Sequence, residues 1–253
     1  MIDWEHTFAA IWRPRKEKLR PVYHIDPIAL SDLVGIDNQK QRLIDNTTRF
    51  LGGKPANNAL LWGARGTGKS SLIKAVFNEF KNKKLRLVEV DKTDLLSLHD
   101  IVDDIREQDF RFIIYCDDLS FDANDSSYKA LKSVMEGSIE LPPENVLVYA
   151  TSNRRNLMPE SMKDNLESSN VQGEVHYADA IEEKISLADR FGLRLSFYSI
   201  TQQDYLDVVD NYFRNDSVDK ADLHKHAIQF AAERGARSGR IAKQFYCYFI
   251  DRK

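Results

Sequence analysis

The chain has 253 residues, of which 42% are hydrophobic and 30% charged, as in an ordinary globular protein with one large core or one core and a small second domain. Its formal net charge of −3 argues against a general attraction of the whole surface to nucleic acid, although a local basic patch remains compatible with it. No run approaches the roughly 18 apolar residues of a membrane helix, so we expect no membrane span.

The chain start and the two cysteines predict a cytoplasmic location. The first residues, MIDWEHTFAAIW, carry acids and lack the uninterrupted apolar run of a signal peptide. Cys116 and Cys247 each lie inside an apolar run, FIIYCDD and QFYCYF. We expect both to be buried, reduced thiols, as is usual in the cytosol.

Residues 1–21 are the first predicted segment. Aromatic and aliphatic residues at helical spacing, from Trp4 to Trp12, predict a short amphipathic helix over residues 3–12. A basic stretch with prolines follows, which indicates an extended linker. We interpret this linker first as a solvated arm that packs on its own or a neighbouring domain, and second as an arm that follows phosphates. Its cations are Arg13, Arg15, Lys16, Lys18 and Arg20.

Strands and helices alternate in the next segment, residues 22–200. Short apolar runs bounded by turn residues or charges predict strands, and helical patterns lie between them. This alternation indicates a parallel sheet covered by helices. The five predicted strands are 58–62, 85–90, 110–116, 146–151 and 193–200.

The segment 201–253 has a different character. Three helical patterns follow one another without a strand, and Gly235 supplies a stop before the last. We therefore predict a small, all-helical lid domain, with helices over 202–214, 218–233 and 238–252.

The first predicted strand leads into a phosphate-binding loop. The run GARGTGKS fits the pattern G-x-x-x-x-G-K-[ST], with an apolar strand before it and a helical pattern after it. Its backbone N–H groups form a nest for anions, the lysine reaches the β- and γ-phosphates, and the serine binds Mg²⁺. We expect the nucleotide to contact Gly63, Ala64, Arg65, Gly66, Thr67, Gly68, Lys69, Ser70 and Ser71.

A phosphate loop alone does not distinguish ATP from GTP. The segment from Asp91 to Asp94, DKTD, resembles the guanine-reading pattern N-K-x-D. Aspartate replaces the asparagine, however, and the segment follows the second predicted strand instead of lying well beyond the magnesium aspartate. We interpret it as the end of a strand and the cap of a helix, and favour ATP.

Two acids end the third predicted strand. Asp117 and Asp118 follow FIIYC, and in a doubly wound sheet ligands bind at the carboxyl ends of the strands. We expect Asp117 to orient Mg²⁺ and its waters, and Asp118 to polarise the attacking water. Many ATPases with a phosphate loop carry glutamate at the position of Asp118. The aspartate side chain is one methylene shorter, so its carboxylate falls short by roughly 1.5 Å, a misplacement that could cost about 100-fold in rate.

Together these motifs resemble the AAA+ superfamily of ATPases. VLVYATSN ends with Asn153 at the position of sensor 1, and LADRFGL places Arg190 in a context similar to the arginine-finger box of Holliday-junction branch-migration motors. GARSGRIAKQF resembles their sensor 2 segment, with Arg240 at a helix start and Arg237 as its rival. SDLVGID resembles the box that wraps the adenine, with Val34, Gly35 and Ile36.

More narrowly, residues 20–253 resemble a bacterial family of predicted AAA+ ATPases of unknown function, through LVGID, GARGTGKSS, DDLSF, ATSNRR and EEKISLADRFGL. That family also carries aspartate at the position of Asp118. The resemblance implies a five-stranded parallel sheet of order 5-1-4-3-2, ATP and Mg²⁺ as ligands, and hydrolysis that moves or remodels a macromolecule, DNA or protein. It also implies a homo-oligomeric ring or partial ring in which Arg190 completes a neighbour's site. The alternative is an assembly module gated by the nucleotide, with slow hydrolysis.

One departure lies between Asn153 and Arg190. The stretch of about 156–182 is polar and has little apolar periodicity, so we interpret it as a flexible loop or a partner-binding element. Arg154 and Arg155 directly precede it. We interpret them first as solvated or interface charges and second as residues that face DNA.

Overall fold

The computed structural model describes residues 2–122, 125–137, 139–155, 157 and 186–250. Within them one sheet carries the strands β1 Ala9–Arg13, β2 Lys18–Val22, β3 Ala59–Gly63, β4 Leu85–Glu89, β5 Arg111–Cys116, β6 Val146–Ser152 and β7 Leu193–Phe197. The helices are α1 Asp37–Leu51, α2 Lys69–Phe80, α3 Leu98–Ile105, α4 Tyr128–Glu136, α7 Gln202–Tyr212, α8 Lys220–Glu233 and α9 Gly239–Phe249.

The strand order is β2-β1-β4-β5-β6-β3-β7. The five neighbouring strands β4, β5, β6, β3 and β7 are parallel to one another. They are the five predicted strands, and read from β7 to β4 they have the predicted order 5-1-4-3-2, so the predicted fold class is confirmed. The sheet is larger than predicted, because β1 pairs in parallel with β4 and β2 pairs antiparallel with β1.

This hairpin corrects the prediction for residues 1–21. The segment 3–12 is not a helix, and the basic stretch is not an extended linker but the turn and second strand of the hairpin. Trp12 and Leu19 face each other across the hairpin and are buried against α3 and its neighbours. The open edge of β4 and this apolar surface outweigh the local helical spacing, because strand formation depends mainly on its packing partners.

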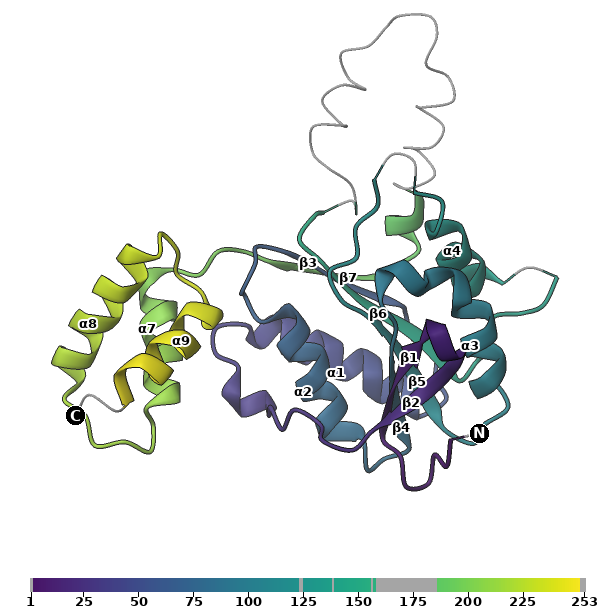
Figure 1. The fold of residues 1–253 in the computed structure, drawn as a ribbon, viewed down its shortest axis with the longest axis horizontal. Coiled ribbons are helices and arrows are strands. Elements are labelled where there is room, and N and C mark those ends of the chain that lie inside the picture. Colours follow the sequence, from purple (N-terminus) through teal and green to yellow (C-terminus); the bar gives the residue numbers. More distant parts are fainter. Residues whose placement is uncertain (1, 123–124, 138, 156, 158–185, 251–253) are drawn as a thin grey trace, which may run out of the picture.

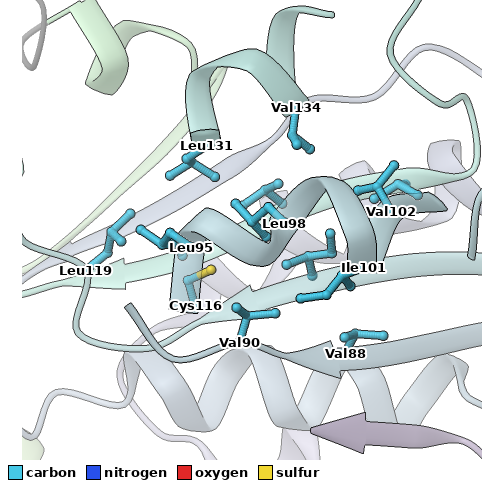
Figure 2. Close-up of a cluster of buried hydrophobic side chains, with 14 of the residues drawn as sticks. Val88, Val90, Leu95, Leu98, Ile101, Val102, Cys116, Leu119, Leu131 and Val134 are labelled. Atoms are coloured by element: carbon cyan, nitrogen blue, oxygen red, sulfur yellow. The ribbon is translucent and has the colours of Figure 1, made fainter. Parts of the chain in front are cut away.

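Helices cover both faces of the sheet (Figure 1). On one face, α1 and α2 pack on β3, β4, β5 and β7 through a cluster that includes Leu43, Leu72 and Phe77. On the other face, Leu98, Ile101 and Val102 of α3 lie over Val88 and Cys116, with α4 beside them (Figure 2). Strands buried from both sides explain why their sequences are nearly continuous apolar runs.

The helices α7, α8 and α9 form their own core beside the sheet, built around Tyr205, Phe213 and Phe245 (Figure 1). A capping box between Thr201 and Asp204 starts α7 directly after the last strand. The lid also contacts the phosphate loop, since the N–H of Gly239 donates to the carbonyl of Gly66 at 2.9 Å.

The cysteines differ from each other. Cys116 is buried as predicted, and burial raises the pKa of its thiol to about 12. Cys247 is exposed, so the prediction that it is buried was wrong. It lies two residues after the buried Phe245 in α9, a rotation of about 200° that turns it away from the lid core. None of the helices within the described residues is long and apolar enough to cross a membrane.

Candidate functional site

The predicted phosphate loop joins β3 to α2 at the carboxyl edge of the sheet. Gly63 has a φ of 131°, and a Cβ atom there would lie 1.9 Å from the carbonyl oxygen of Phe197. Gly66 has a φ of 73°, and a Cβ atom there would lie 2.8 Å from Cβ of Ser238. Glycine is therefore required both by β7 on one side of the loop and by the lid on the other.

Lys69 is 7% exposed and its ammonium group is fully engaged. Its Nζ donates to the carbonyls of Gly63 at 2.9 Å and Ala64 at 2.7 Å, and to Oδ1 of Asn153 at 3.1 Å. Burial lowers the pKa of Lys69, while the charges of Asp118 and Asp117 oppose this effect. Lys69 thus bonds Asn153 and lies near enough to Asp117 and Asp118 for their charges to affect it.

Ser70 and Asp117 meet as predicted for a pair of magnesium ligands. Oγ of Ser70 donates to Oδ1 of Asp117 at 2.7 Å, and Oγ1 of Thr151 donates to the same oxygen at 2.6 Å. Packing around this carboxyl raises its pKa, but the hydrogen bonds from Thr151 and Ser70 outweigh it and hold the pKa of Asp117 below its usual value. The carboxylate is therefore ionised at neutral pH.

Asp118 and Asn153 also lie together. Nδ2 of Asn153 donates to Oδ1 of Asp118 at 2.5 Å, so that the one amide joins Asp118 to Lys69. Asp118 has a φ of 51°, a left-handed conformation that is uncommon for a residue with a side chain. Its N–H donates to Oγ1 of Thr151 at 2.9 Å, which stabilises this turn at the end of β5.

Two residues near Asp117 were not predicted from the sequence. Thr151 bonds both acids, and the signal for it was a polar residue near the end of a buried strand, two positions before Asn153. Tyr115 is 2% exposed and its hydroxyl has no hydrogen-bond partner among the described atoms. Burial, together with the nearby charge of Asp117, raises the pKa of Tyr115. Its strand position made it indistinguishable from a core aromatic.

The segment predicted to wrap the adenine lies between the phosphate loop and the lid. A Cβ atom added to Gly68 would lie 3.7 Å from Cδ1 of Ile36. A Cβ atom added to Gly35 would lie 3.9 Å from Cβ of Asp204 in α7. Val34 precedes them and is half-buried.

The two candidate sensor 2 arginines point to different places. Arg240 lies beside the phosphate loop, with its Cβ 3.6 Å from where a Cβ atom on Gly66 would be, and its charge contributes to lowering the pKa of Lys69. Arg237 is exposed, and its Nη2 donates to Oε1 of Gln202 at 3.2 Å on α7. Arg65 is exposed on the loop itself, and Ser71 lies in the first turn of α2.

Arg190 lies between a helical turn, residues 186–189, and β7 at the edge of the sheet. Its guanidinium is 42% exposed and forms an ion pair with Glu136, the last residue of α4. The structure thus does not bring Arg190 to the phosphate loop of its own chain. Arg155 lies over the ring of Trp62 at 5.5 Å, while the stretch 156–182 falls almost entirely outside the described residues.

The whole chain, apart from its first four residues, matches a known family. The match covers residues 5–253, and the family is described as "Protein of unknown function (DUF815)". The chain belongs to this family. The narrower of the two sequence resemblances is thereby confirmed.

The fold is similar to that of RuvB from Thermotoga maritima. One variant of that protein aligns with a TM-score of 0.58 and 17% identity over 90% of this chain and 66% of its own. A second variant aligns with a TM-score of 0.51 and 14% identity over 87% of this chain and 71% of its own. At this identity the likeness establishes the fold, which is the AAA+ P-loop fold expected from the motifs.

Short stretches also resemble the replication factor C large subunits of two archaea. The protein of Staphylothermus marinus is 37% identical over 76 residues, 30% of this chain and 17% of its own length. That of Ignicoccus hospitalis is 36% identical over 63 residues, 24% of this chain and 13% of its own. Since so little of these relatives is covered, their activities are not transferred to this DUF815 member.

Proposed function

We propose that the protein binds ATP with Mg²⁺ and hydrolyses it as a homo-oligomer, and that hydrolysis moves or remodels a macromolecule, DNA or protein. The observation that carries this proposal is the meeting of two predicted motifs, in which Oγ of Ser70 lies 2.7 Å from Oδ1 of Asp117. These residues are 47 positions apart in the chain, and their contact is what a shared magnesium ion requires.

The residues at this edge fit ATP and Mg²⁺. The loop offers backbone N–H groups at the start of α2, next to the ammonium group of Lys69. Among the described residues no group of three or more acids, histidines and cysteines could enclose a metal ion. Mg²⁺ suits such a site, since it commonly takes one or two protein ligands and fills its other positions with phosphate oxygens and water. Bound there, the ion would neutralise charge on the β- and γ-phosphates.

The chain's own residues divide the remaining work. Lys69 exchanges its carbonyl partners for phosphate oxygens, and Arg240, from the lid, adds a second cation to the same loop. Asp118 accepts a proton from the attacking water, and Asn153 holds both Asp118 and a phosphate oxygen. Val34, Gly35 and Ile36 contact the adenine, and the absence of a guanine-reading asparagine before Lys92 favours ATP over GTP.

Arg190 completes the site of an adjoining subunit. It lies at the sheet edge with its guanidinium paired to Glu136, which holds the arginine away from its own phosphate loop. A planar cation delivered in trans to the γ-phosphate increases the rate of hydrolysis by about 10³–10⁵. The active species is then a ring or partial ring in the cytoplasm.

A second candidate function is a nucleotide-gated assembly that hydrolyses ATP slowly. The observation in its favour is the geometry of Asp118, which is shorter than glutamate and has its Oδ1 engaged by Asn153 at 2.5 Å. A base held in this way activates water poorly until the amide moves. Turnover measured at several protein concentrations separates the two functions, because only the first predicts many turnovers per assembled site.

The decisive experiment mixes two inactive variants, Arg190→Ala and Lys69→Ala. Each alone should lose hydrolysis, and Lys69→Ala should also lose tight binding of Mg-ATP. In mixed assemblies some interfaces pair an intact phosphate loop with an intact arginine, so ATPase activity should return and increase with total concentration.

A matched control replaces Arg194, a partly buried arginine four residues further on that pairs with Asp189. Arg194→Ala should keep its activity and need no complementation. If subunits exchange and the mixture stays inactive, or if Arg190→Ala alone hydrolyses ATP normally, the oligomeric site is wrong. In a separate experiment, an Asp118→Asn variant that binds ATP without turnover would serve to capture the macromolecular substrate.

A further inference from the structure

The N-terminal hairpin concentrates positive charge in a chain that is acidic overall. Residues 13–20, RPRKEKLR, contain five cations and one acid, a net charge of +4, whereas the whole chain carries −3. Such a separation of charge within one chain indicates a surface that attracts anions locally. The basic hairpin is defined here as these eight residues, and its cations are Arg13, Arg15, Lys16, Lys18 and Arg20.

All five cations are exposed, and within the described part of the chain none of them forms an ion pair. Arg20 makes one weak contact, from Nη1 to the carbonyl of Pro21 at 3.3 Å. Some cations elsewhere on the surface have acidic partners, such as Lys84 with Asp109 and Arg214 with Asp32, whereas in the basic hairpin none of five neighbouring cations does. The basic hairpin is thus a group of cations with no ion-pair partner among the residues that the structure describes.

The hairpin is held rigidly on the sheet. Trp12 and Leu19 are 4% and 8% exposed and belong to the core under α3. The buried guanidinium of Arg86 in β4 donates from Nε to the carbonyl of Trp4 at 2.7 Å and lies 5.0 Å from the ring of Phe8. This clamp fixes the segment that leads into β1. A ligand of the hairpin would therefore not have to order the backbone, which is a large part of the free energy lost on binding.

The register places three of the cations on one face. Arg13 pairs with Lys18 and Ile11 pairs with Arg20 across the hairpin, while the intervening pair of Trp12 and Leu19 faces the core. Since directly opposite residues share a face, Arg13, Lys18 and Arg20 project from the outer side. Lys18 and Arg20 are two residues apart, a separation of about 7 Å along the strand.

The turn of the hairpin adds Arg15 and Lys16. Because β1 runs parallel to β4 and β5, this turn lies at the same edge of the sheet as Asp117 and the phosphate loop. Protection of an exposed sheet edge explains Pro21 and a charge on β2, but it does not require cations in the turn or on β1.

We propose that the basic hairpin binds the phosphate backbone of a nucleic acid. Three of its five cations are arginines, whose planar donors match phosphate oxygens. An acidic protein surface is disfavoured because the exposed positions of residues 13–20 offer only charged side chains and Pro14, with no apolar or aromatic centre of the kind that protein interfaces bury. The contact is independent of base sequence, and it does not rest on the proposed ATPase activity.

The test measures binding of the full chain to labelled DNA and RNA of arbitrary sequence, single- and double-stranded, by fluorescence anisotropy without nucleotide. The variant Arg13→Ala/Lys18→Ala/Arg20→Ala removes the outer face. Loss of three phosphate contacts should make the slope of log K against log salt shallower by about 2 for single strands and about 3 for duplex. At fixed low salt, affinity should fall on the order of tenfold or more.

The matched control is Arg42→Ala/Lys225→Ala/Lys243→Ala, which removes three exposed cations from α1, α8 and α9 and leaves the hairpin intact. It changes the net charge equally and should keep the wild-type salt slope. A second variant, Arg15→Glu/Lys16→Glu, reverses the charge of the turn without changing a buried residue, and it should also weaken DNA binding. Circular dichroism checks that each variant is folded.

The proposal is overturned if the outer-face variant binds DNA with the affinity and salt slope of the control. It is also overturned if the wild-type chain binds neither DNA nor RNA at low salt. Binding of polyglutamate through the same residues in that case would identify an acidic polypeptide as the ligand instead. Steady ATP hydrolysis by the outer-face variant separates this result from the ATPase proposal, since the hairpin lies outside the nucleotide site.

Discussion

Two groups of charged residues lie along the same edge of the sheet and differ in how they are paired. At the nucleotide site, Lys69 and Asp117 each accept or donate several hydrogen bonds within the chain. In the basic hairpin, the cations project from a rigid support and have no acidic partner within the described residues.

The difference indicates two kinds of binding. A nucleotide bound as proposed would replace hydrogen bonds that already exist around Lys69 and Asn153, and so would shift the side chains proposed to act in catalysis. An anion at the hairpin replaces only water and counterions, so that its binding is mainly electrostatic and depends strongly on salt. The first arrangement suits a site that changes conformation when its ligand binds, and the second suits electrostatic binding along a polyanion.

Among single changes that leave nucleotide binding intact, the largest effect on hydrolysis is expected for Asp118→Asn. Asparagine keeps the shape and still accepts a hydrogen bond from Asn153, but it cannot take a proton from water. Hydrolysis should fall by about 10²–10⁴, the usual contribution of a general base, while Mg-ATP affinity stays near that of the wild type. Steady-state ATPase assays and ATP titrations measure the two quantities. Unchanged turnover would mean that another group activates the water.

The hairpin is expected to loosen when its clamp is removed. Arg86→Met keeps contact with Phe8 and Phe110 but leaves the carbonyls of Trp4, Lys81 and Leu85 without their donor. Burial already lowers the pKa of Arg86, so part of the loss is offset by the charge that no longer has to be buried. We expect the free energy of unfolding to decrease by about 2–4 kcal/mol, measured by urea denaturation.

The matched control for this change is Arg42→Met on the exposed surface of α1, which should stay within about 0.5 kcal/mol of the wild type. Equal stability of the two variants would show that the hairpin is held by its apolar contacts alone.

A milder change at the nucleotide site is Thr151→Val. It has nearly the same shape but removes the donor to Asp117 and the acceptor for the N–H of Asp118. Groups that orient a metal ligand typically contribute 10–100-fold to metal affinity, so half-maximal ATPase activity should need roughly tenfold more Mg²⁺. Thr151→Ser keeps the hydroxyl and should restore the wild-type magnesium dependence. If serine and valine behave alike, the hydroxyl is not what positions Asp117.

The smallest effect is expected at a charged pair between the lid and the α/β domain. Asp32 accepts from the N–H of Ala29 and from Arg214, and these contacts hold the pKa of its carboxyl below 3.8. A lowered pKa stabilises the folded state above pH 3.8, and this contribution is lost as the pH falls through the lower value. Asp32→Asn should therefore cost at most about 1 kcal/mol at pH 7 and less below pH 3.8. Equal costs at both pH values would assign the effect to shape instead of charge.

The meeting of the predicted site residues could be foreseen because each lies in a short local motif. Lys69 and Ser70 lie within one short glycine-rich motif, and Asp117, Asp118 and Asn153 each follow an apolar strand directly. Ends of parallel strands meet at one edge of the sheet, so knowing the strands is enough to bring these residues together. The roles of Arg190 and Arg240 remain predictions, although the structure places Arg240 nearer to the phosphate loop than Arg237.

The hairpin could not be predicted in this way. The spacing of Trp4, Phe8, Ile11 and Trp12 fits one side of a helix, although Trp12 lies in a strand that buries Ala9 and Ala10 as well. What decides between them is the open edge of β4, the clamp of Arg86 and the apolar surface under α3, all of which are distant in sequence. Thr151 bonding to Asp117, Glu136 pairing with Arg190 and the exposure of Cys247 depend on the same kind of information. The sequence by itself determined where the candidate phosphate-binding groups lie along the chain, because those motifs follow from strand ends and glycine turns. Only the tertiary structure decided which edge the N-terminal segment covers, because a strand is stabilised by the neighbours it finds and not by its own residues.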